Sequence, residues 1–71
     1  MTIGTYLKQQ RERLELTTRQ AASKAKVSYS MLSHYERDLA MPGFDKAVRL
    51  CEAYKVNIKN LIDELKNVGT K

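Results

Sequence analysis

Apolar residues recur at helical spacing along most of the chain, and no segment shows the sustained alternation of a β-strand. The pattern predicts five short helices: residues 3–14, a short helix that begins after Thr17, and residues 29–37, 44–54 and 58–66. Their predicted inner faces are formed by Ile3, Leu7, Leu14, Ala21, Ala22, Ala25, Met31, Leu32, Tyr35, Phe44, Ala47, Leu50, Cys51, Tyr54, Ile58, Leu61, Ile62 and Leu65. We therefore expect an all-α domain over residues 1–67, followed by a flexible tail over residues 68–71.

Capping signals mark where three of these helices begin. Thr17 and Gln20 have the spacing of a capping box, and Ser28 and Asn57 are favourable N-cap residues. Because the second and third helices are joined by a very short turn, they must cross steeply, which is the geometry of a helix-turn-helix. Other small helical bundles also contain such pairs, so the spacing alone leaves the class of domain open.

The chain has 71 residues, with one cysteine, Cys51, and one histidine, His34. We therefore expect no disulfide within the chain, no cysteine-based zinc site, no paired-histidine metal site and no cofactor. Cys51 is expected to be a small core residue rather than a redox sensor. The longest apolar run, residues 39–41, is too short for a membrane span, and no secretory signal is visible. A reduced, intracellular setting fits these observations.

The chain offers little for catalysis. Ser30 and His34 are four residues apart on a predicted helix and could meet, but no orienting residue, oxyanion site or pocket accompanies them. There is no glycine-rich phosphate loop and no nucleophile elbow. We therefore expect neither an enzyme nor a small-molecule substrate.

Positive charge is concentrated in the first half of the chain. The net charge is +5, and residues 1–37 hold seven basic and three acidic residues, a net charge of +4. Residues 38–71 hold six basic and five acidic residues, a net charge of +1. This one-sided excess suits a polyanion such as DNA, although a solubilising surface charge would give the same distribution.

Residues 3–65 resemble the Cro/CI-type (XRE-family) helix-turn-helix domains of lambdoid phage repressors and small bacterial regulators. The residues that carry the likeness are Ile3–Leu7, Arg11, Leu14, Leu16, Thr17, Ala22, Val27, Ser28, Ser33–Arg37, Pro42, Leu50, Glu52, Ala53, Val56, Leu61 and Ile62. The resemblance implies a five-helix lambda-repressor-like fold whose third helix lies in the major groove of double-stranded DNA. It also implies a bacterial or phage-encoded, nucleoid-associated protein of the cytoplasm.

The resemblance further implies which side chains face the DNA. The positions that match base-contacting residues are Tyr29, Ser30, Ser33 and His34, and residues 30, 33, 34 and 37 share one helical face. The implied phosphate-contacting residues are Thr18, Arg19, Ser28, Arg37, Arg11, Lys24 and Lys26. Arg11 and Glu36 are implied to form a structural ion pair between the first and third helices. Solvated side chains are the alternative for the exposed residues, and Ser28 could act as a cap alone.

Arg19 gives an indication that does not depend on the resemblance. It lies in the first turn of the second helix, where a cation opposes the helix dipole. A phosphate bound at that helix end would reverse the penalty, because it would accept from the free N–H groups and from Arg19 together. The alternative is a slightly unfavourable surface arginine.

The chain departs from the family pattern at several positions. Thr18 stands where relatives often have a phosphate-holding glutamine, and the loop after Arg37 is less basic than in many relatives. Lys26, Asp38 and Lys55 stand where relatives usually have glycine. If Lys26 and Lys55 adopt left-handed backbone conformations, each costs about 1–2 kcal/mol relative to glycine. The weaker positive charge of the loop over residues 38–41 argues against a backbone contact from this loop to DNA.

We therefore expect a sequence-specific regulator that binds a pseudo-palindromic operator as a homodimer and represses by occluding polymerase. The half-sites would lie about 34 Å apart, and the fifth helix and the tail are the expected dimer surface. The alternative is a protein-interaction module on the same fold, such as an antitoxin or an antirepressor-binding partner, in which DNA binding is secondary. RNA binding is a third possibility, but it needs exposed stacking aromatics, and only Tyr29 and Tyr6 are candidates.

Overall fold

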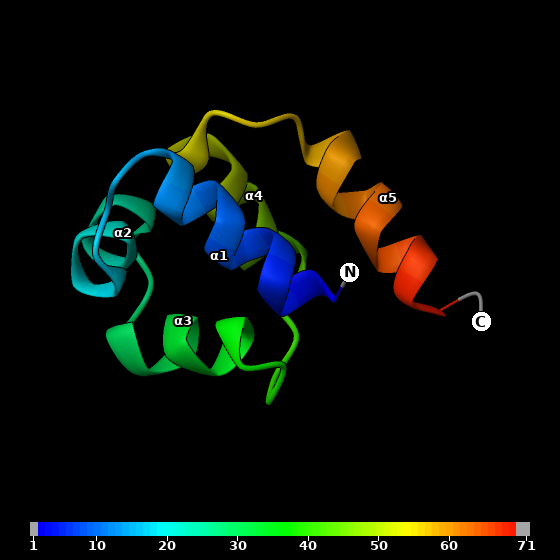
Figure 1. Ribbon diagram of the computed structural model, residues 1–71, viewed down its shortest axis with the longest axis horizontal. Coiled ribbons are helices and arrows are strands. Elements are labelled where there is room, and N and C mark those ends of the chain that lie inside the picture. The colour runs from blue at the N-terminus through cyan, green and yellow to red at the C-terminus, as the bar shows by residue number, and fades with distance from the viewer. Residues whose placement is uncertain (1, 70–71) are drawn as a thin grey trace.

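Five helices account for most of the chain. The computed structural model describes the backbone of residues 2–69 and the side-chain surroundings of residues 2–64. The helices are α1 (Ile3–Arg13), α2 (Thr18–Ala25), α3 (Tyr29–Glu36), α4 (Phe44–Tyr54) and α5 (Ile58–Gly69). Figure 1 shows α2 nearly end-on where α3 runs across the view, so the two helices cross steeply, as the short turn between them predicts. The expected all-α fold of five helices with a helix-turn-helix is confirmed for the described residues.

The predicted capping residues are present and make the expected hydrogen bonds. The Thr17 hydroxyl accepts from the Gln20 backbone N–H at 3.1 Å, and the Gln20 side chain accepts from the Thr17 N–H at 2.9 Å. The Ser28 hydroxyl accepts from the Met31 N–H at 3.0 Å. At the start of α5, the Asn57 side chain accepts from a backbone N–H at 2.8 Å. Side chains therefore satisfy N–H groups that would otherwise lack partners at these helix starts.

Within residues 2–69, four residues other than glycine adopt left-handed backbone conformations. Lys26 and Lys55, which follow α2 and α4, have φ values of 60° and 59°, and Asp38 and Glu15 have 60° and 59°. The family's usual glycines at three of these positions would be free of the steric cost. Each lysine therefore carries a penalty of about 1–2 kcal/mol relative to glycine.

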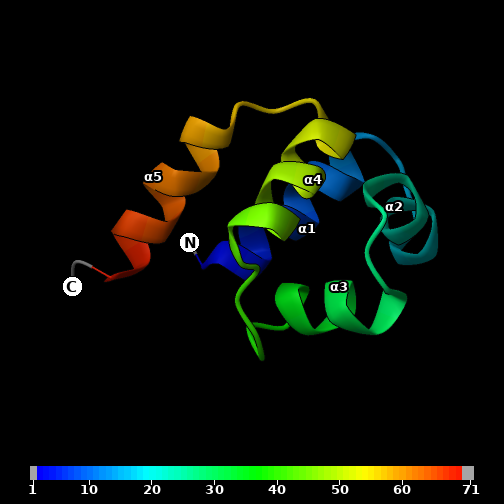
Figure 2. The ribbon, with the colours of Figure 1, turned by 180° about the vertical axis from the view of Figure 1, so that it is seen from behind.

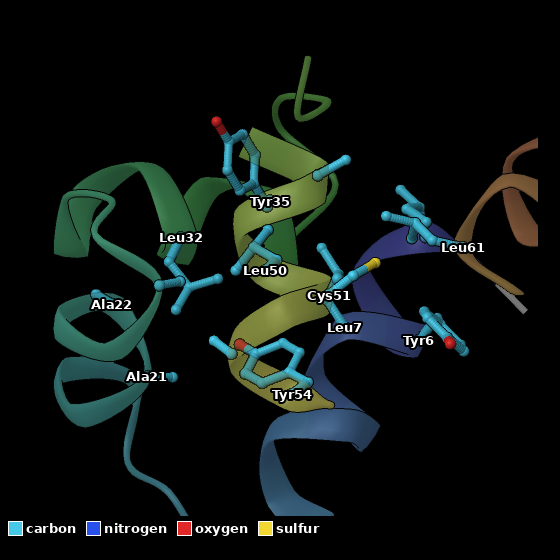
Figure 3. Packing of buried hydrophobic residues seen from close by; sticks show 14 residues of the cluster. Tyr6, Leu7, Ala21, Ala22, Leu32, Tyr35, Leu50, Cys51, Tyr54 and Leu61 are labelled. Carbon is cyan, nitrogen blue, oxygen red and sulfur yellow. The ribbon is translucent and has the colours of Figure 1, made fainter. Parts of the chain in front are cut away.

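α4 lies at the centre of the core. Figure 3 shows it between Ala21 and Ala22 of α2 on one side and Tyr6 and Leu7 of α1 on the other. The small side chains of α2 allow this helix to approach its neighbours closely. Fully or almost fully buried residues from the five helices are Ile3, Leu7, Ala21, Ala22, Ala25, Leu32, Tyr35, Ala47, Leu50, Cys51, Tyr54 and Leu61. Leu14 and Ile58 are partly buried against this cluster.

Three residues that were expected in the core are exposed instead. Phe44 has 75% of its surface exposed, and Met31 and Ile62 are also exposed. Helical side chains lean toward the N-terminus of their helix, so the ring of Phe44, the first residue of α4, projects beyond the packed part of that helix. Met31 lies in the first turn of α3, and Ile62 flanks the buried Leu61. The expected positions of Phe44, Met31 and Ile62 were therefore wrong.

α5 is longer than the sequence predicts. It continues to Gly69, so Val68 and Gly69, which were expected in the tail, are helical. The rest of the expected tail, residues 70–71, and the side chain of Leu65 lie outside the described residues. Figure 2, seen from behind, shows α5 at the opposite end of the molecule from α2.

The start of α1 packs directly against the end of α3. Gly4 is buried, and a Cβ atom there would lie 2.6 Å from the Tyr35 carbonyl oxygen and 2.7 Å from that of Glu36. The Gly4 N–H donates to the Asp38 carboxylate at 2.9 Å. Glycine is required at this position because both close neighbours are backbone oxygens, which cannot move aside as a flexible side chain can.

We expect Gly4→Ala to lower the free energy of unfolding by about 2 kcal/mol, because the added methyl group forces α1 away from α3. Chemical denaturation measures the effect. Gly43→Ala is the matched control, since a Cβ atom at Gly43 meets nothing within 4 Å, and its cost should stay below about 1 kcal/mol. Equal stability of the two variants would contradict this account of the α1–α3 contact.

Candidate nucleic-acid interface

α3 presents a polar face to solvent. Ser30, His34 and Arg37 are exposed and Ser33 is partly buried, whereas Leu32 and Tyr35 on the other side of the helix are buried. Figures 1 and 2 both show α3 along one edge of the molecule, with α1 and α4 on its inner side. Hydroxyl, imidazole and guanidinium groups are therefore displayed together on a rigid element. These groups donate and accept hydrogen bonds, and they suit contacts with base edges and phosphates.

α2 brings a cation to the start of α3. Arg19 is exposed in the first turn of α2, which contains no acidic residue. Its guanidinium carbon lies 4.5 Å from the centre of the Tyr29 ring. Among residues 2–64, Arg19 forms no ion pair. The sequence suggested that Arg19 contacts a phosphate at the start of the second helix, and the structure places this side chain next to the N-terminal end of α3 as well.

The other expected phosphate-contacting residues are arranged less uniformly. Thr18 is partly buried beside Arg19, and the Ser28 hydroxyl is engaged in capping α3. Lys24 and Lys26 are exposed near the opposite end of α2 from Arg19. There they line a shallow hollow between α2 and α4 together with Arg49 and Lys55.

Arg11 and Glu36 form the ion pair that the resemblance implies. The Arg11 Nε and Nη2 atoms donate to the two Glu36 carboxylate oxygens at 2.8 and 3.1 Å, and Nη1 donates to the Leu16 carbonyl at 2.8 Å. Only 11% and 8% of the two side chains are exposed. The hydrogen bond to Glu36 raises the pKa of Arg11 above its usual value and keeps the guanidinium charged. Because three of its nitrogen atoms donate within the protein, Arg11 is a structural residue, and we leave it out of the interface.

Two contacts near the interface were not predicted. Asp38 joins the end of α3 to Gly4, as described above. Arg49 of α4 donates to the Lys26 carbonyl in the turn between α2 and α3 at 3.1 Å, and it pairs with Asp45 at 3.4 Å. The four-residue spacing of Asp45 and Arg49 is a signal that the sequence contains. The contact with Lys26 has no such signal, because it joins segments 23 residues apart.

Other sequence expectations concern chemistry outside this face. Cys51 is buried, and burial raises the pKa of its thiol, which agrees with a core role. Tyr6 is also buried and offers no ring for stacking on RNA. Within residues 2–69, no helix is long and apolar enough to cross a membrane. In the same part of the chain, His, Cys, Asp and Glu residues form no cluster of three or more that could hold a metal ion.

Comparison with known proteins identifies the family. Residues 2–65 match the family described as a helix-turn-helix domain. The chain belongs to this family. The helix-turn-helix domain is 34% identical over 62 residues to the HTH-type transcriptional regulator ImmR of Bacillus subtilis (strain 168). The match covers 87% of the chain and 49% of ImmR, so the chain spans about half the length of that relative.

Solved structures confirm the Cro/CI-type resemblance. SinR, a master regulator of biofilm formation solved in complex with DNA, matches with a TM-score of 0.83 and 30% identity over 87% of this helix-turn-helix domain and all of that chain. SinR in a complex with SinI matches with a TM-score of 0.84 and 29% identity, over 94% of this chain and 66% of that one. The P22 c2 repressor, solved with a synthetic operator, has 19% identity and a TM-score of 0.83, over 90% of this chain and 97% of that one, which supports the fold alone. This is a family of transcriptional regulators, not of enzymes.

We expect Glu36→Ala to lower the free energy of unfolding by about 3 kcal/mol, because it leaves the buried Arg11 charge without its partner. Thermal and chemical denaturation measure the loss. Removal of the exposed Glu52 carboxylate, as Glu52→Ala, is the control and should change stability by less than about 0.5 kcal/mol. Normal melting of Glu36→Ala together with lost DNA binding would overturn the structural role of Glu36.

Proposed function

We propose that this helix-turn-helix domain binds double-stranded DNA as a sequence-specific transcriptional regulator, with α3 in the major groove. The observation that carries the proposal is the polar, exposed face of α3, with Arg19 of α2 placed at its N-terminal end. A helix fits the major groove, where each base pair presents a distinct pattern of donors and acceptors. A cation at the N-terminal end of such a helix lies where the DNA backbone would pass.

The relatives support this proposal. SinR, which is 30% identical to this chain, was solved in complex with DNA. ImmR is named as a transcriptional regulator. The net charge of +5 favours association with a polyanion, and it predicts binding that weakens as salt is raised. Because its relative ImmR is a bacterial transcriptional regulator, we assign the protein to the bacterial cytoplasm.

Each residue of the interface has a distinct role in this proposal. Ser30, Ser33 and His34 face base edges. His34 discriminates most, because its ring nitrogens are fixed in position whereas a serine hydroxyl rotates to donate or accept. Arg37, at the end of α3, and Arg19 contact phosphates on the two sides of the groove. Secondary phosphate contacts come from Thr18, the backbone around Ser28, Lys24 and Lys26.

We expect selection from a random duplex pool, at about physiological salt, to enrich a pseudo-palindrome with half-sites about 34 Å apart. His34→Ala should then change the preference at one base position in each half-site, because it removes one donor and acceptor from a base edge. Lys59→Ala, an exposed substitution on α5, is the control and should select the wild-type site. Failure of folded wild-type protein to enrich any sequence would contradict the proposal.

A second candidate function is binding of protein through an exposed apolar surface. Leu39, Met41 and Phe44, which we call the loop surface, are 62%, 57% and 75% exposed between the end of α3 and the start of α4. Large apolar side chains gathered on a short segment favour a protein contact. This observation supports the interaction module considered above, and SinR was also solved in complex with another protein, SinI.

We infer that a second copy of this chain covers the loop surface, and that the domain represses as a homodimer by occluding polymerase. The loop surface follows α3 directly, so a two-fold axis near it would bring the α3 helices of both copies to the same side of the dimer. Isologous contacts of this kind match a pseudo-palindromic operator. The sequence predicted instead that the dimer forms through α5 and the tail. Among residues 58–64 of that surface, the exposed large apolar residue is Ile62.

We expect Phe44→Ser to raise the dimer dissociation constant at least tenfold, because it removes the most exposed apolar side chain of the loop surface. Sedimentation velocity over a concentration series measures this constant. Ile62→Ser is the matched variant on α5 and should leave it within about twofold. Dissociation by Ile62→Ser alone would assign the dimer to α5. Wild-type protein that stays monomeric, both free and on the selected duplex, would contradict the homodimer and leave the loop surface to another protein.

A further inference from the structure

The stack between Arg19 and Tyr29 joins the first turns of the two helices of the helix-turn-helix. Arg19 is the second residue of α2, Tyr29 is the first residue of α3, and the guanidinium carbon lies 4.5 Å from the ring centre. This distance is within the range in which a cation is attracted to the face of an aromatic ring. The contact joins two side chains and involves no backbone hydrogen bond of either helix. We therefore look for its role in what the side chains do.

The first turn of α2 does not itself hold the Arg19 side chain in place. The free N–H groups at the start of α2 repel a cation, and the first turn of α2 contains no carboxylate to hold it. An exposed arginine also has a long side chain with large rotational freedom, which a phosphate would have to restrict on binding. The Tyr29 ring supplies an attractive face and limits the rotamers of Arg19 before any ligand is present.

Stacking on an aromatic face leaves the binding edge of a guanidinium available. A ring stacks on the flat face of an arginine, whereas the N–H groups that bind a phosphate in pairs point outward from its edge. Arg19 is exposed and forms no ion pair among residues 2–64. Stacking on Tyr29 and binding a phosphate are therefore compatible.

We propose that Tyr29 is a positioning residue that holds Arg19 ready for a DNA phosphate, rather than a base-contacting residue as its place in the sequence suggested. The inference rests on the proposed function, because it takes the DNA backbone as the ligand of Arg19. Its consequence is specific: the aromatic ring of Tyr29 matters and its hydroxyl does not. Tyr29 then contributes affinity to every DNA sequence alike and contributes no preference at any base position.

The stack is tested first in the protein without DNA. We expect the Arg19 side-chain protons to show upfield ring-current shifts by NMR in the wild type and in Tyr29→Phe. These shifts should disappear in Tyr29→Ala. Unchanged Arg19 shifts in Tyr29→Ala would show that the side chains do not stack in solution, and this would overturn the inference without touching the proposed function.

The second test measures binding to a random-sequence 20-base-pair duplex and to the selected duplex over a salt series. We expect Arg19→Ala and Tyr29→Ala each to weaken binding several-fold on both duplexes, and Arg19→Ala to lower the salt slope by about one unit. The double variant should bind no more weakly than Arg19→Ala, because Tyr29 acts through Arg19. Tyr29→Phe should stay within about twofold of the wild type.

Met31→Ala is the matched control, since it shortens another exposed side chain in the first turn of α3. It should leave binding to both duplexes within about twofold of the wild type. A loss in Tyr29→Phe equal to that in Tyr29→Ala, or a changed preference at one base position, would instead make Tyr29 a direct DNA contact. If Tyr29→Ala binds both duplexes as tightly as the wild type does, the inference about Tyr29 is contradicted and the proposed function is not. Failure of the wild type to bind either duplex would contradict the proposed function.

Discussion

The buried ion pair between Arg11 and Glu36 is the interaction on which the rest of the structure depends. One guanidinium joins three segments: it belongs to α1, it holds the carboxylate near the end of α3, and it donates to the Leu16 carbonyl just before α2. A charge that is almost fully covered requires all of these partners, because leaving it unpaired costs several kcal/mol. The positions of α2 and α3 relative to α1 are therefore coupled through a single side chain.

Further contacts on the inner side of α3 and at its ends fix the orientation of this helix. At Gly4, α1 packs closely against the last backbone carbonyls of α3. Asp38 shows why a residue other than glycine is kept at a left-handed position there. Its φ of 60° carries a steric cost, but its carboxylate accepts the Gly4 N–H at 2.9 Å, which glycine could not do. Arg49 acts similarly at the turn before α3, where it donates to the Lys26 carbonyl. The outer face of α3 remains available because its supports all lie on the inner side.

The exposed face differs chemically from the surfaces that hold the fold. Ser30, His34 and Arg37 form no hydrogen bond to another side chain among residues 2–64, so their polar groups are available to a ligand. Arg19 is the exception in that Tyr29 restrains it from the neighbouring helix. Under the proposed function, the polar groups that lack partners among residues 2–64 read bases, and the arginine beside Tyr29 binds a phosphate. The apolar loop surface lies directly beyond the end of α3, next to this face.

The sequence by itself determined where the helices begin, and it identified the buried Ala21, Ala22 and Ala25 of α2 and the buried Ala47, Leu50, Cys51 and Tyr54 of α4. Thr17, Ser28 and Asn57 cap helices through contacts within three residues, and such contacts need no tertiary structure. The resemblance added the Arg11–Glu36 pair. Only the tertiary structure decided the exposure of Phe44 and the stack of Arg19 on Tyr29, because each depends on where one helix ends relative to another. Helical periodicity specifies the direction in which a side chain points around the axis of its helix. It contains no information about how far the neighbouring helix extends.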